Sequence, residues 1–220
     1  MLNVFIRRVI KPELLDHLPP DEARPNLADL IRINQHFGGH SVILKTLARV
    51  AQRDEAFSLL DIGSASGDTA RTIKATYPRS RVVSFDYNAT NIAAAPRPKI
   101  IGNAFALPFA PASFDYVLCS LFLHHFQNEQ VVELLRNFFA AAHKALLVCD
   151  LERNVIPFLF LPATKYVMNW KKVTVHDGMI SVRASFTDEE LKSLAEQAGI
   201  ASCETSVHRP AFRISMIARK

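Results

Sequence analysis

The stretch FSLLDIGSASGDTA, residues 57–70, decides the fold. An apolar run ends in Asp61, a turn containing Gly63 and Gly67 follows, and a helical pattern begins after the turn. Glycines at such a turn let the backbone bend sharply and approach a ligand closely, while the helix start offers free N–H groups. Dinucleotide-binding enzymes share this pattern. A turn with a purely structural role is a further explanation when this segment is considered by itself.

Outward from this stretch, short apolar runs alternate with helix-like segments. Apolar strands separated by helices indicate a parallel sheet covered on both faces, so the predicted fold class is α/β, with a doubly wound, mostly parallel sheet. The predicted strands are FSLLDI, RVVSFD, KIIGNA, FDYVLCS and ALLVCDL, and the predicted helices lie near 67–76, 89–95 and 130–143.

The flanking regions complete one predicted domain over residues 1–220. Residues 1–55 are predicted to be a helical N-terminal cover interrupted at Gly38-Gly39, and 57–151 the central core. The interval 152–186 is too long for an ordinary connection and is predicted to be a lid or pocket-forming insertion. In 187–220, Thr187 and Glu190 form the capping box of a last helix that Gly199 ends, and two strands follow.

Composition excludes several classes of protein. The 26 Lys and Arg residues exceed the 21 Asp and Glu residues for a net charge of +5, but they are scattered, so no nucleic-acid partner is expected. The three cysteines are far apart, which favours reduced residues of a cytoplasmic protein. No run approaches the roughly 18 apolar residues of a membrane span, and HH and HD alone make no convincing metal site.

Three more segments indicate a ligand-binding site, because each lies at the end of a predicted strand, on the edge where open α/β sheets bind ligands. They contain Asp86, Gly102-Asn103-Ala104 and the run SFDYVLCSLFLHHF. Asp86 ends the second strand about 20 residues after the glycine turn, where a carboxylate can accept from ribose hydroxyls. In order and spacing, DIGSASGD, SFDYN and GNAFALPFAPASFDYVLCSLFLHH resemble the class I S-adenosylmethionine-dependent methyltransferases over residues 57–150. The turn lacks the G-x-G-x-x-G register, which argues against a nicotinamide enzyme.

The resemblance implies a seven-stranded Rossmann-like sheet in which the last hairpin contributes one antiparallel strand. It implies that Gly63 to Gly67 wrap the methionine portion of the cofactor, that Asp86 binds the ribose, and that Asn103-Ala104 meets the adenine. The middle glycine of the family's turn is Ala65 here, which is tolerated if its φ is negative, and the Asn103 carbonyl can replace the usual Asp as acceptor. The full predicted cofactor set is Asp61, Gly63, Ser64, Gly67, Asp68, Asp86, Tyr87, Asn103, Ala104 and Ser120.

His124 and His125 follow the fourth strand and are the predicted catalytic residues, because an imidazole there could take a proton from a substrate hydroxyl. The alternative is that one packs and the other caps or meets solvent. Asp150, Arg153 and His176 are predicted to contact the substrate, although an Asp150–Arg153 ion pair and a turn at Asp177-Gly178 are alternatives.

The sequence therefore predicts a metal-independent methyltransferase that uses S-adenosylmethionine on a small phenolic, polyketide-like or quinone-like acceptor, with O-methylation favoured. Flanking segments such as LADLIRINQHFGG, CDLERNVIPFLF and HDGMISVRASFTDEEL resemble bacterial small-molecule methyltransferases. A cofactor-binding regulatory protein without catalysis and a methyltransferase that acts on RNA or protein remain the alternatives.

Overall fold

A computed structural model describes residues 7–15 and 18–220. The strand and helix alternation predicted from residue 57 onward is confirmed. The elements of the central region are β1 (Ser58–Ile62), α3 (Asp68–Thr76), β2 (Arg81–Asp86), α4 (Ala89–Ile92), β3 (Lys99–Ile101), β4 (Phe114–Ser120), the short 3₁₀ helix η3 (Leu123–His125), α5 (Asn128–Ala141) and β5 (Ala142–Leu151).

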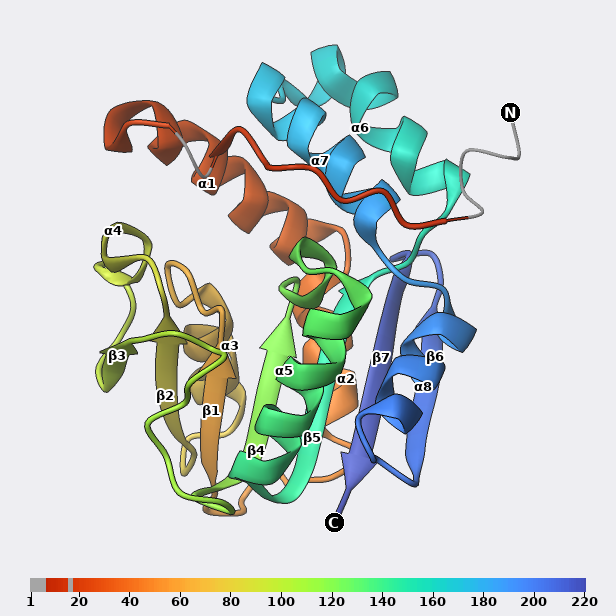
Figure 1. Ribbon diagram of the computed structural model, residues 1–220. Coiled ribbons are helices and arrows are strands. Elements are labelled where there is room, and N and C mark those ends of the chain that lie inside the picture. The colour runs from red at the N-terminus through yellow and green to blue at the C-terminus, as the bar shows by residue number, and fades with distance from the viewer. Residues whose placement is uncertain (1–6, 16–17) are drawn as a thin grey trace.

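The strands form one seven-stranded sheet in the order β3-β2-β1-β4-β5-β7-β6. Strands β1 to β5 pair in parallel, whereas β7 (Arg213–Arg219) runs antiparallel to both β5 and β6 (Cys203–His208). In Figure 1 the arrow of β7 points in the opposite direction to the arrows of the other strands. The expected sheet, including its single antiparallel insertion from the last hairpin, is therefore confirmed.

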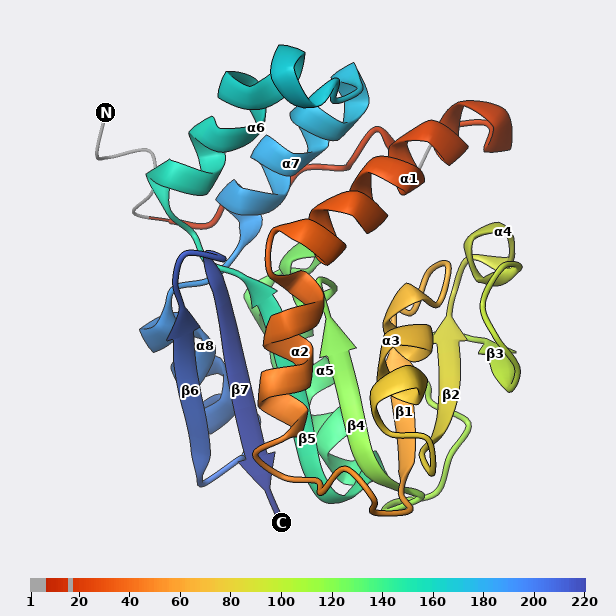
Figure 2. The same cartoon turned by 180° about the vertical axis from the view of Figure 1, so that it is seen from behind.

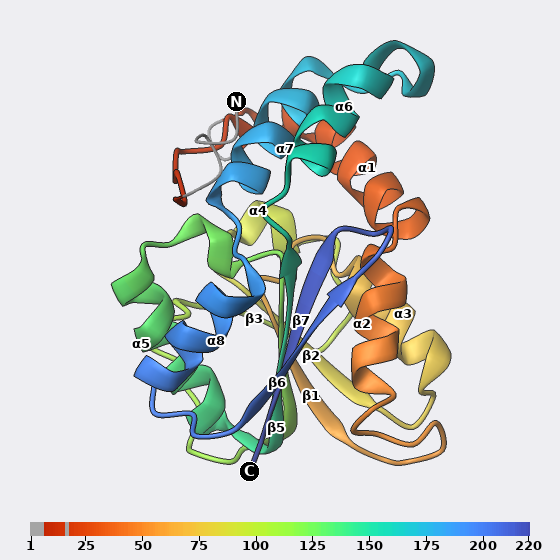
Figure 3. The same ribbon diagram turned by 90° about the vertical axis from the view of Figure 1, so that its right-hand side faces the viewer.

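Helices cover both faces of the sheet (Figure 3). On one face α5 and α8 (Asp188–Gln197) bury a cluster around Leu134, Phe138 and Leu191, and on the other α2 (Gly39–Leu47) and α3 bury one around Leu47 and Ile73. Burying both faces explains why the central strands read as nearly continuous apolar runs. The capping box at Thr187 and Glu190 is present, and Gly199 follows α8 with φ +82°.

Above the carboxyl ends of the parallel strands lies a second layer (Figure 2). It comprises α1 (Pro20–His36), α6 (Val155–Met168) and α7 (Lys172–Ala184), so the predicted insertion 152–186 consists of two helices. The break expected at Gly38-Gly39 separates α1 from α2, and Gly38 has φ +89°. Residues 7–15, expected as part of a helical cover, contain no α-helix, and the N-terminal part of that prediction was wrong here.

We call residues 7–15 the strap, because they cross beneath α7 (Figure 1). The strap is held by polar groups rather than by its own secondary structure. Asp177 of α7 accepts from the N–H groups of Leu14 and Leu15, at 3.0 and 2.9 Å. At its other end, the Arg8 guanidinium lies 4.0 Å from the Phe186 ring centroid and donates to the carbonyls of Phe126 and Ala184.

Among the described residues, no helix has both the length and the apolar character needed to cross a membrane.

Candidate active site

A cavity of about 1200 Å³ lies between the carboxyl edge of the sheet and the layer above it. Its floor comes from the ends of β1, β2 and β4, and its walls come from α1, α6, α7 and the β6–β7 turn. This is the edge at which open α/β sheets bind ligands. The cavity lining contains the whole predicted cofactor set except Gly67, together with both predicted catalytic histidines.

The turn after β1 shapes the floor of the cavity. Gly63 and Gly67 have φ +70° and +74°, and a Cβ on Gly63 would come within 2.5 Å of the Phe122 ring. Ala65 has φ +42°, so the expectation that this alanine replaces the family's glycine with a negative φ was wrong. Its N–H donates to Asp86 Oδ2 at 2.8 Å, and this contact fixes an orientation that an L-residue adopts only at a cost.

Asp86 lies at the end of β2 and ties two turns together. Besides accepting from Ala65, its second oxygen accepts from the Asn88 N–H at 2.8 Å. The carboxylate is therefore fixed in place while it lines the cavity. Tyr87, the next residue, is 81% exposed and forms part of the rim.

Asp61 and Ser64 provide the clearest test of whether a polar ligand fits this floor. Asp61 Oδ2 and Ser64 Oγ are buried without a hydrogen-bond partner among the described residues, yet both residues line the cavity. Burial, with the nearby charges of Asp68 and Asp86, raises the pKa of Asp61 well above its ordinary value. Buried polar groups normally have hydrogen-bond partners. An ammonium or hydroxyl group of a bound ligand would supply partners to these two oxygen atoms. S-adenosylmethionine carries both groups and fits.

Asp68 at the start of α3 is already engaged. His40 of α2 contacts its Oδ2 through Nε2 at 2.9 Å. Burial acts to raise the pKa of Asp68, but the hydrogen bond and the charge of His40 outweigh it and hold that pKa below the ordinary value. Asp68 therefore braces the glycine turn against α2 while it faces the cavity.

The remaining predicted cofactor residues lie along the same edge. Asn103 Oδ1 accepts from the Phe105 N–H at 3.0 Å, which closes a small turn after β3, and Ala104 is 8% exposed behind it. Ser120 ends β4 and lines the cavity. The structure thus brings all these positions to one surface, and their contacts with a cofactor stay a prediction.

His124 is the most constrained polar side chain of the cavity wall. After β4, Leu121 takes φ +51° and the chain turns into η3, which directs His124 inward, where it is 3% exposed. Its Nδ1 lies 2.6 Å from Oδ1 of Asp150, a fully buried residue of β5. Burial acts to lower the pKa of His124, but the charge and hydrogen bond of Asp150 outweigh it, so the pKa is raised.

The same contact fixes the tautomer of His124. Burial opposes ionisation of Asp150, but His124 holds the pKa of this carboxyl below its ordinary value, so Asp150 is a carboxylate at neutral pH. A carboxylate only accepts hydrogen bonds, and the proton of the neutral imidazole therefore lies on Nδ1. Nε2 is left as a proton acceptor at the cavity wall, with geometry suited to general-base chemistry.

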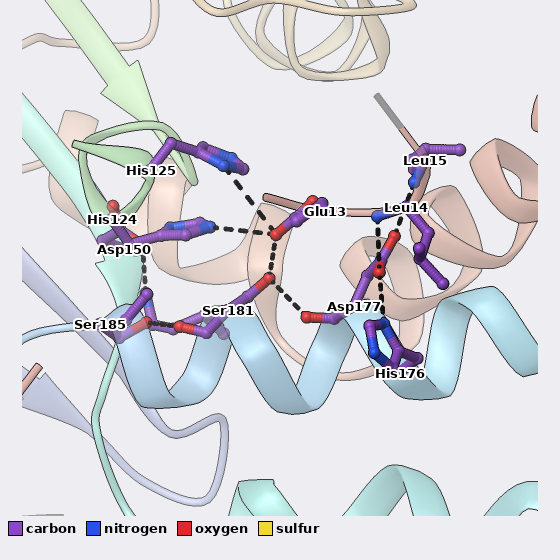
Figure 4. A network of polar contacts seen from close by, with 12 residues as sticks. Glu13, Leu14, Leu15, His124, His125, Asp150, His176, Asp177, Ser181 and Ser185 are labelled. Atoms are coloured by element: carbon purple, nitrogen blue, oxygen red, sulfur yellow. Dashed lines mark hydrogen bonds and ion pairs between the residues drawn. The ribbon is translucent and has the colours of Figure 1, made fainter. Parts of the chain in front are cut away.

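Glu13 of the strap approaches both histidines, as Figure 4 shows. One carboxylate oxygen lies 3.9 Å from His124 Nε2 and 3.9 Å from His125 Nδ1, and Ser181 of α7 donates to it. Burial and the charge of His124 lower the pKa of His125, so His125 is neutral at physiological pH.

Glu13, His124 and His125 also form a possible ligand set for a metal ion, with ligand atoms within 4.8 Å of one another. The prediction of no metal rested on the lack of a third ligand near HH, and Glu13 supplies one. Nitrogen and oxygen ligands about 2.1 Å from zinc lie roughly 3.4 Å apart in a tetrahedral site. The 3.9 Å separations from Glu13 are longer than this, so the three residues would have to move closer together to bind an ion, and the absence of a metal stays a prediction.

The three predicted substrate residues do not line the cavity. Asp150 contacts His124 on the side away from the cavity. The Arg153 guanidinium donates to both Glu190 oxygens, at 2.7 and 2.6 Å, and so connects the end of β5 to α8. His176 lies on the exposed side of α7 with its side chain 51% exposed, beside Asp177. Asp177-Gly178 is part of α7 and not a turn, so that alternative was wrong.

Sequence reasoning missed Glu13 and Arg213, which line the cavity, and His40, which contacts the cavity residue Asp68. Glu13 lies in an acidic, proline-containing stretch far from the histidines in sequence, and no local pattern marks it. His40 follows the Gly38-Gly39 break and could have been suspected from its place before β1. Arg213 begins a strand that otherwise reads as apolar.

Comparisons with known proteins agree with this geometry. Residues 60–146 match the profile of the family described as "Methyltransferase domain". A bergaptol O-methyltransferase from Glehnia littoralis is 24% identical over 185 residues, which cover 77% of this chain and 48% of that protein. The chain therefore spans about half the length of this curated relative.

Among solved structures, a plantazolicin methyltransferase in complex with S-adenosylhomocysteine superimposes with a TM-score of 0.68 at 13% identity, over 90% of both chains. Human N-acetylserotonin methyltransferase in complex with S-adenosylmethionine gives a TM-score of 0.61 at 16% identity, covering 87% of this chain and 53% of that one. An S-adenosylmethionine-dependent methyltransferase from Aquifex aeolicus gives 0.62 at 12% identity, covering 92% and 98%.

The strand order and the glycine turn fit the matched profile, and each match to a solved structure supports the same fold. Residues 60–146 therefore match the methyltransferase-domain family, and the chain has the fold of the S-adenosylmethionine-dependent methyltransferases with which it superimposes.

Proposed function

We propose that this protein transfers the methyl group of S-adenosylmethionine to a hydroxyl oxygen of a small, largely apolar acceptor, with His124 as the general base. Phenolic, polyketide-like and quinone-like molecules are the classes that this proposal favours. The observation that carries it is the His124–Asp150 hydrogen bond, which leaves Nε2 of the cavity-lining His124 as the proton acceptor.

The upper half of the cavity suits an apolar acceptor. Ile156, Phe160 and Leu161 of α6 line it, and the Phe160 ring packs edge to face against Phe37, which directly follows α1, at 5.0 Å between centroids. Ligand cavities are typically apolar with few oriented polar groups, and a wall of this kind excludes water from a reacting pair. That the 152–186 helices act as a mobile lid stays a prediction.

When bound, S-adenosylmethionine supplies an electrophilic methyl group on a sulfonium. Gly63 and Ser64 would hold its methionine portion, with the Asp61 carboxyl accepting from the amino group, and Asp86 would accept from the ribose. His124 Nε2 would take the hydroxyl proton of the acceptor, while Asp150 keeps the imidazole oriented and stabilises the imidazolium that forms. The rest of the rate would come from alignment in a dry cavity.

The metal-free form of this mechanism is supported by the spacing of Glu13 from the histidines, given above. The neutral His125 and the carboxylate of Glu13 flank His124, so Glu13 adds negative charge that favours the imidazolium.

The test is methyl transfer to a panel of phenols, comparing the wild type with His124→Asn. We expect the variant to bind S-adenosylhomocysteine normally and to turn over about 10²–10⁴-fold more slowly, the usual contribution of a general base. His143→Asn, an exposed histidine at the opposite end of β5, is the matched control. Cofactor binding without turnover on any acceptor would favour the regulatory alternative, and no cofactor binding would refute the proposal.

A further inference from the structure

The β6–β7 turn brings a second charged feature to the cavity, away from the histidines. Arg213 begins β7 and pairs with Leu151 of β5 on one side and His208 of β6 on the other. Arg213, His208 and Lys45 of α2 all line the cavity. We call these three residues the basic wall.

Arg213 is buried without the partner that a buried guanidinium needs. It is 6% exposed, its Nε is buried with no hydrogen-bond partner, and no ion pair joins it to a carboxylate among the residues described. Burial lowers its pKa to about 10, and the charge of Asp150 only partly offsets this. Buried charges are almost always paired, and an unpaired one is strongly destabilising.

The other groups near Arg213 do not supply that partner. Asp150 Oδ1 is engaged by His124 Nδ1 and by the Leu151 N–H at 2.7 Å. Asp150 Oδ2 and Arg213 Nε are each buried without a hydrogen-bond partner among the described residues, so these two atoms do not bond to each other. His208 contacts Ser215 Oγ through Nε2 at 2.8 Å, and Lys45 adds a positive charge at an exposed position on the rim. The basic wall therefore presents donors and positive charge to the cavity.

We propose that the basic wall binds a carboxylate group of the acceptor, with Arg213 as its direct partner. This inference deepens the proposed function, on which it rests, by defining the acceptor as a hydroxy acid whose carboxylate lies at Arg213 while its hydroxyl faces His124. A planar guanidinium recognises a carboxylate through paired hydrogen bonds, and Lys45 at the rim would attract the anion.

The S-adenosylmethionine carboxylate is the other source of this chemistry. The predicted cofactor floor lies at the ends of β1, β2, β3 and β4, whereas Arg213 lies across β5 from β4 in the strand order. This placement favours the acceptor as the source, and separate binding measurements distinguish the two.

The probes are benzoate and benzamide, which match in size and differ in charge, titrated into the full chain saturated with S-adenosylhomocysteine. We expect benzoate to bind at least about tenfold more tightly, as a charge-assisted hydrogen bond predicts, and Arg213→Met to abolish the preference. Arg219→Gln, at the exposed far end of the same strand, should keep it. Equal affinity for the probes, or no benzoate binding at millimolar concentration, would overturn the proposal.

Two further measurements keep the outcomes separate. If Arg213→Met weakens S-adenosylhomocysteine and leaves the benzoate preference intact, the group bound at Arg213 is the cofactor carboxylate and the proposal is wrong. If S-adenosylhomocysteine fails to bind the wild type while benzoate is still preferred over benzamide, the proposed function fails and the anion site stands. Should Arg213→Met not fold, the Arg213 Nε–Hε resonance of the wild type must shift with benzoate and not with benzamide, and the absence of that shift counts against the proposal.

Discussion

Replacing Asp150 with Asn tests how the buried carboxylate controls His124. The substitution keeps the size of the side chain and removes the charge that lies 2.6 Å from His124 Nδ1. A charge-assisted hydrogen bond of this kind contributes about 1.5–3 kcal/mol, and about 1.4 kcal/mol corresponds to one pKa unit. Without it, burial alone acts on the imidazole, so the pKa of His124 should fall by roughly one to two units from its raised value.

The sign of this shift gives a specific pH profile. A general base acts in its neutral form, so wild-type turnover should rise with pH through a pKa above the ordinary value of histidine. In Asp150→Asn the rising limb should move to lower pH. Above the limb turnover should be about 10–100-fold lower, because the same 1.5–3 kcal/mol no longer orients His124 and stabilises its imidazolium. The deficit should shrink at low pH, where more of the variant's histidine is neutral.

Steady-state turnover across pH with saturating cofactor measures both effects. Asp115→Asn is the matched control, because Asp115 near the start of β4 contacts Ser58 and Lys144 and lies at the opposite edge of the sheet. The double variant His124→Asn/Asp150→Asn should be no slower than His124→Asn alone, since the two residues act as one unit. An unmoved limb together with unchanged turnover in Asp150→Asn would refute the reasoning.

Four further predictions concern the floor of the cavity and the histidine cluster. Asp86→Ala should weaken S-adenosylhomocysteine binding by about 1.5–3 kcal/mol in calorimetry, through loss of charge-assisted hydrogen bonds, and unchanged affinity would exclude the ribose role. Ala65→Gly should raise the free energy of unfolding by roughly 1 kcal/mol in denaturant titrations, because φ +42° strains an alanine; a destabilised variant would contradict this. Asp61→Asn should stabilise the ligand-free protein at pH 7 and show almost no gain near pH 4. Because the pKa of Asp61 is raised in the folded protein, folding keeps this carboxyl protonated, and this costs stability only at pH values above its unfolded pKa. A gain from Asp61→Asn that does not depend on pH would show that ionisation of Asp61 is not the cause. Turnover should survive exhaustive chelation, and activity restored only by added Zn²⁺ or Mg²⁺ would turn Glu13, His124 and His125 into metal ligands.

The sheet could be predicted because its information is local. The run FSLLDIGSASGD carries a buried strand, a turn and a helix start within a dozen or so residues, and similar units repeat along the chain. The backbone angle of Ala65 could not be predicted in the same way. It depends on Asp86, which holds the Ala65 N–H from the next strand. A rule about alanine in isolation gave the wrong sign for its φ.

The site was predictable where residues follow strand ends and not where distant segments meet. His124 could be identified because it follows β4, whose end lies at the ligand-binding edge of the sheet. The same reasoning predicted that Asp150 contacts the substrate, whereas Asp150 contacts His124 and does not line the cavity. Which face of β5 carries Asp150 depends on the register of three strands. Glu13 and Arg213 reach the cavity through the strap and the final hairpin, and nothing in their neighbouring sequence indicates this.

The division of the cavity between two layers has a consequence for how such proteins diversify. The predicted cofactor surface comes from strand ends and turns within 57–151, whereas most of the opposite wall comes from the strap, α1, α6, α7 and the β6–β7 turn. Residue changes in the outer segments can reshape the part of the cavity that we propose for the acceptor, while the backbone geometry of the glycine turn stays as it is. A duplicated gene could therefore acquire a new acceptor by drift in the outer segments alone, without passing through a form that has lost its methyl donor.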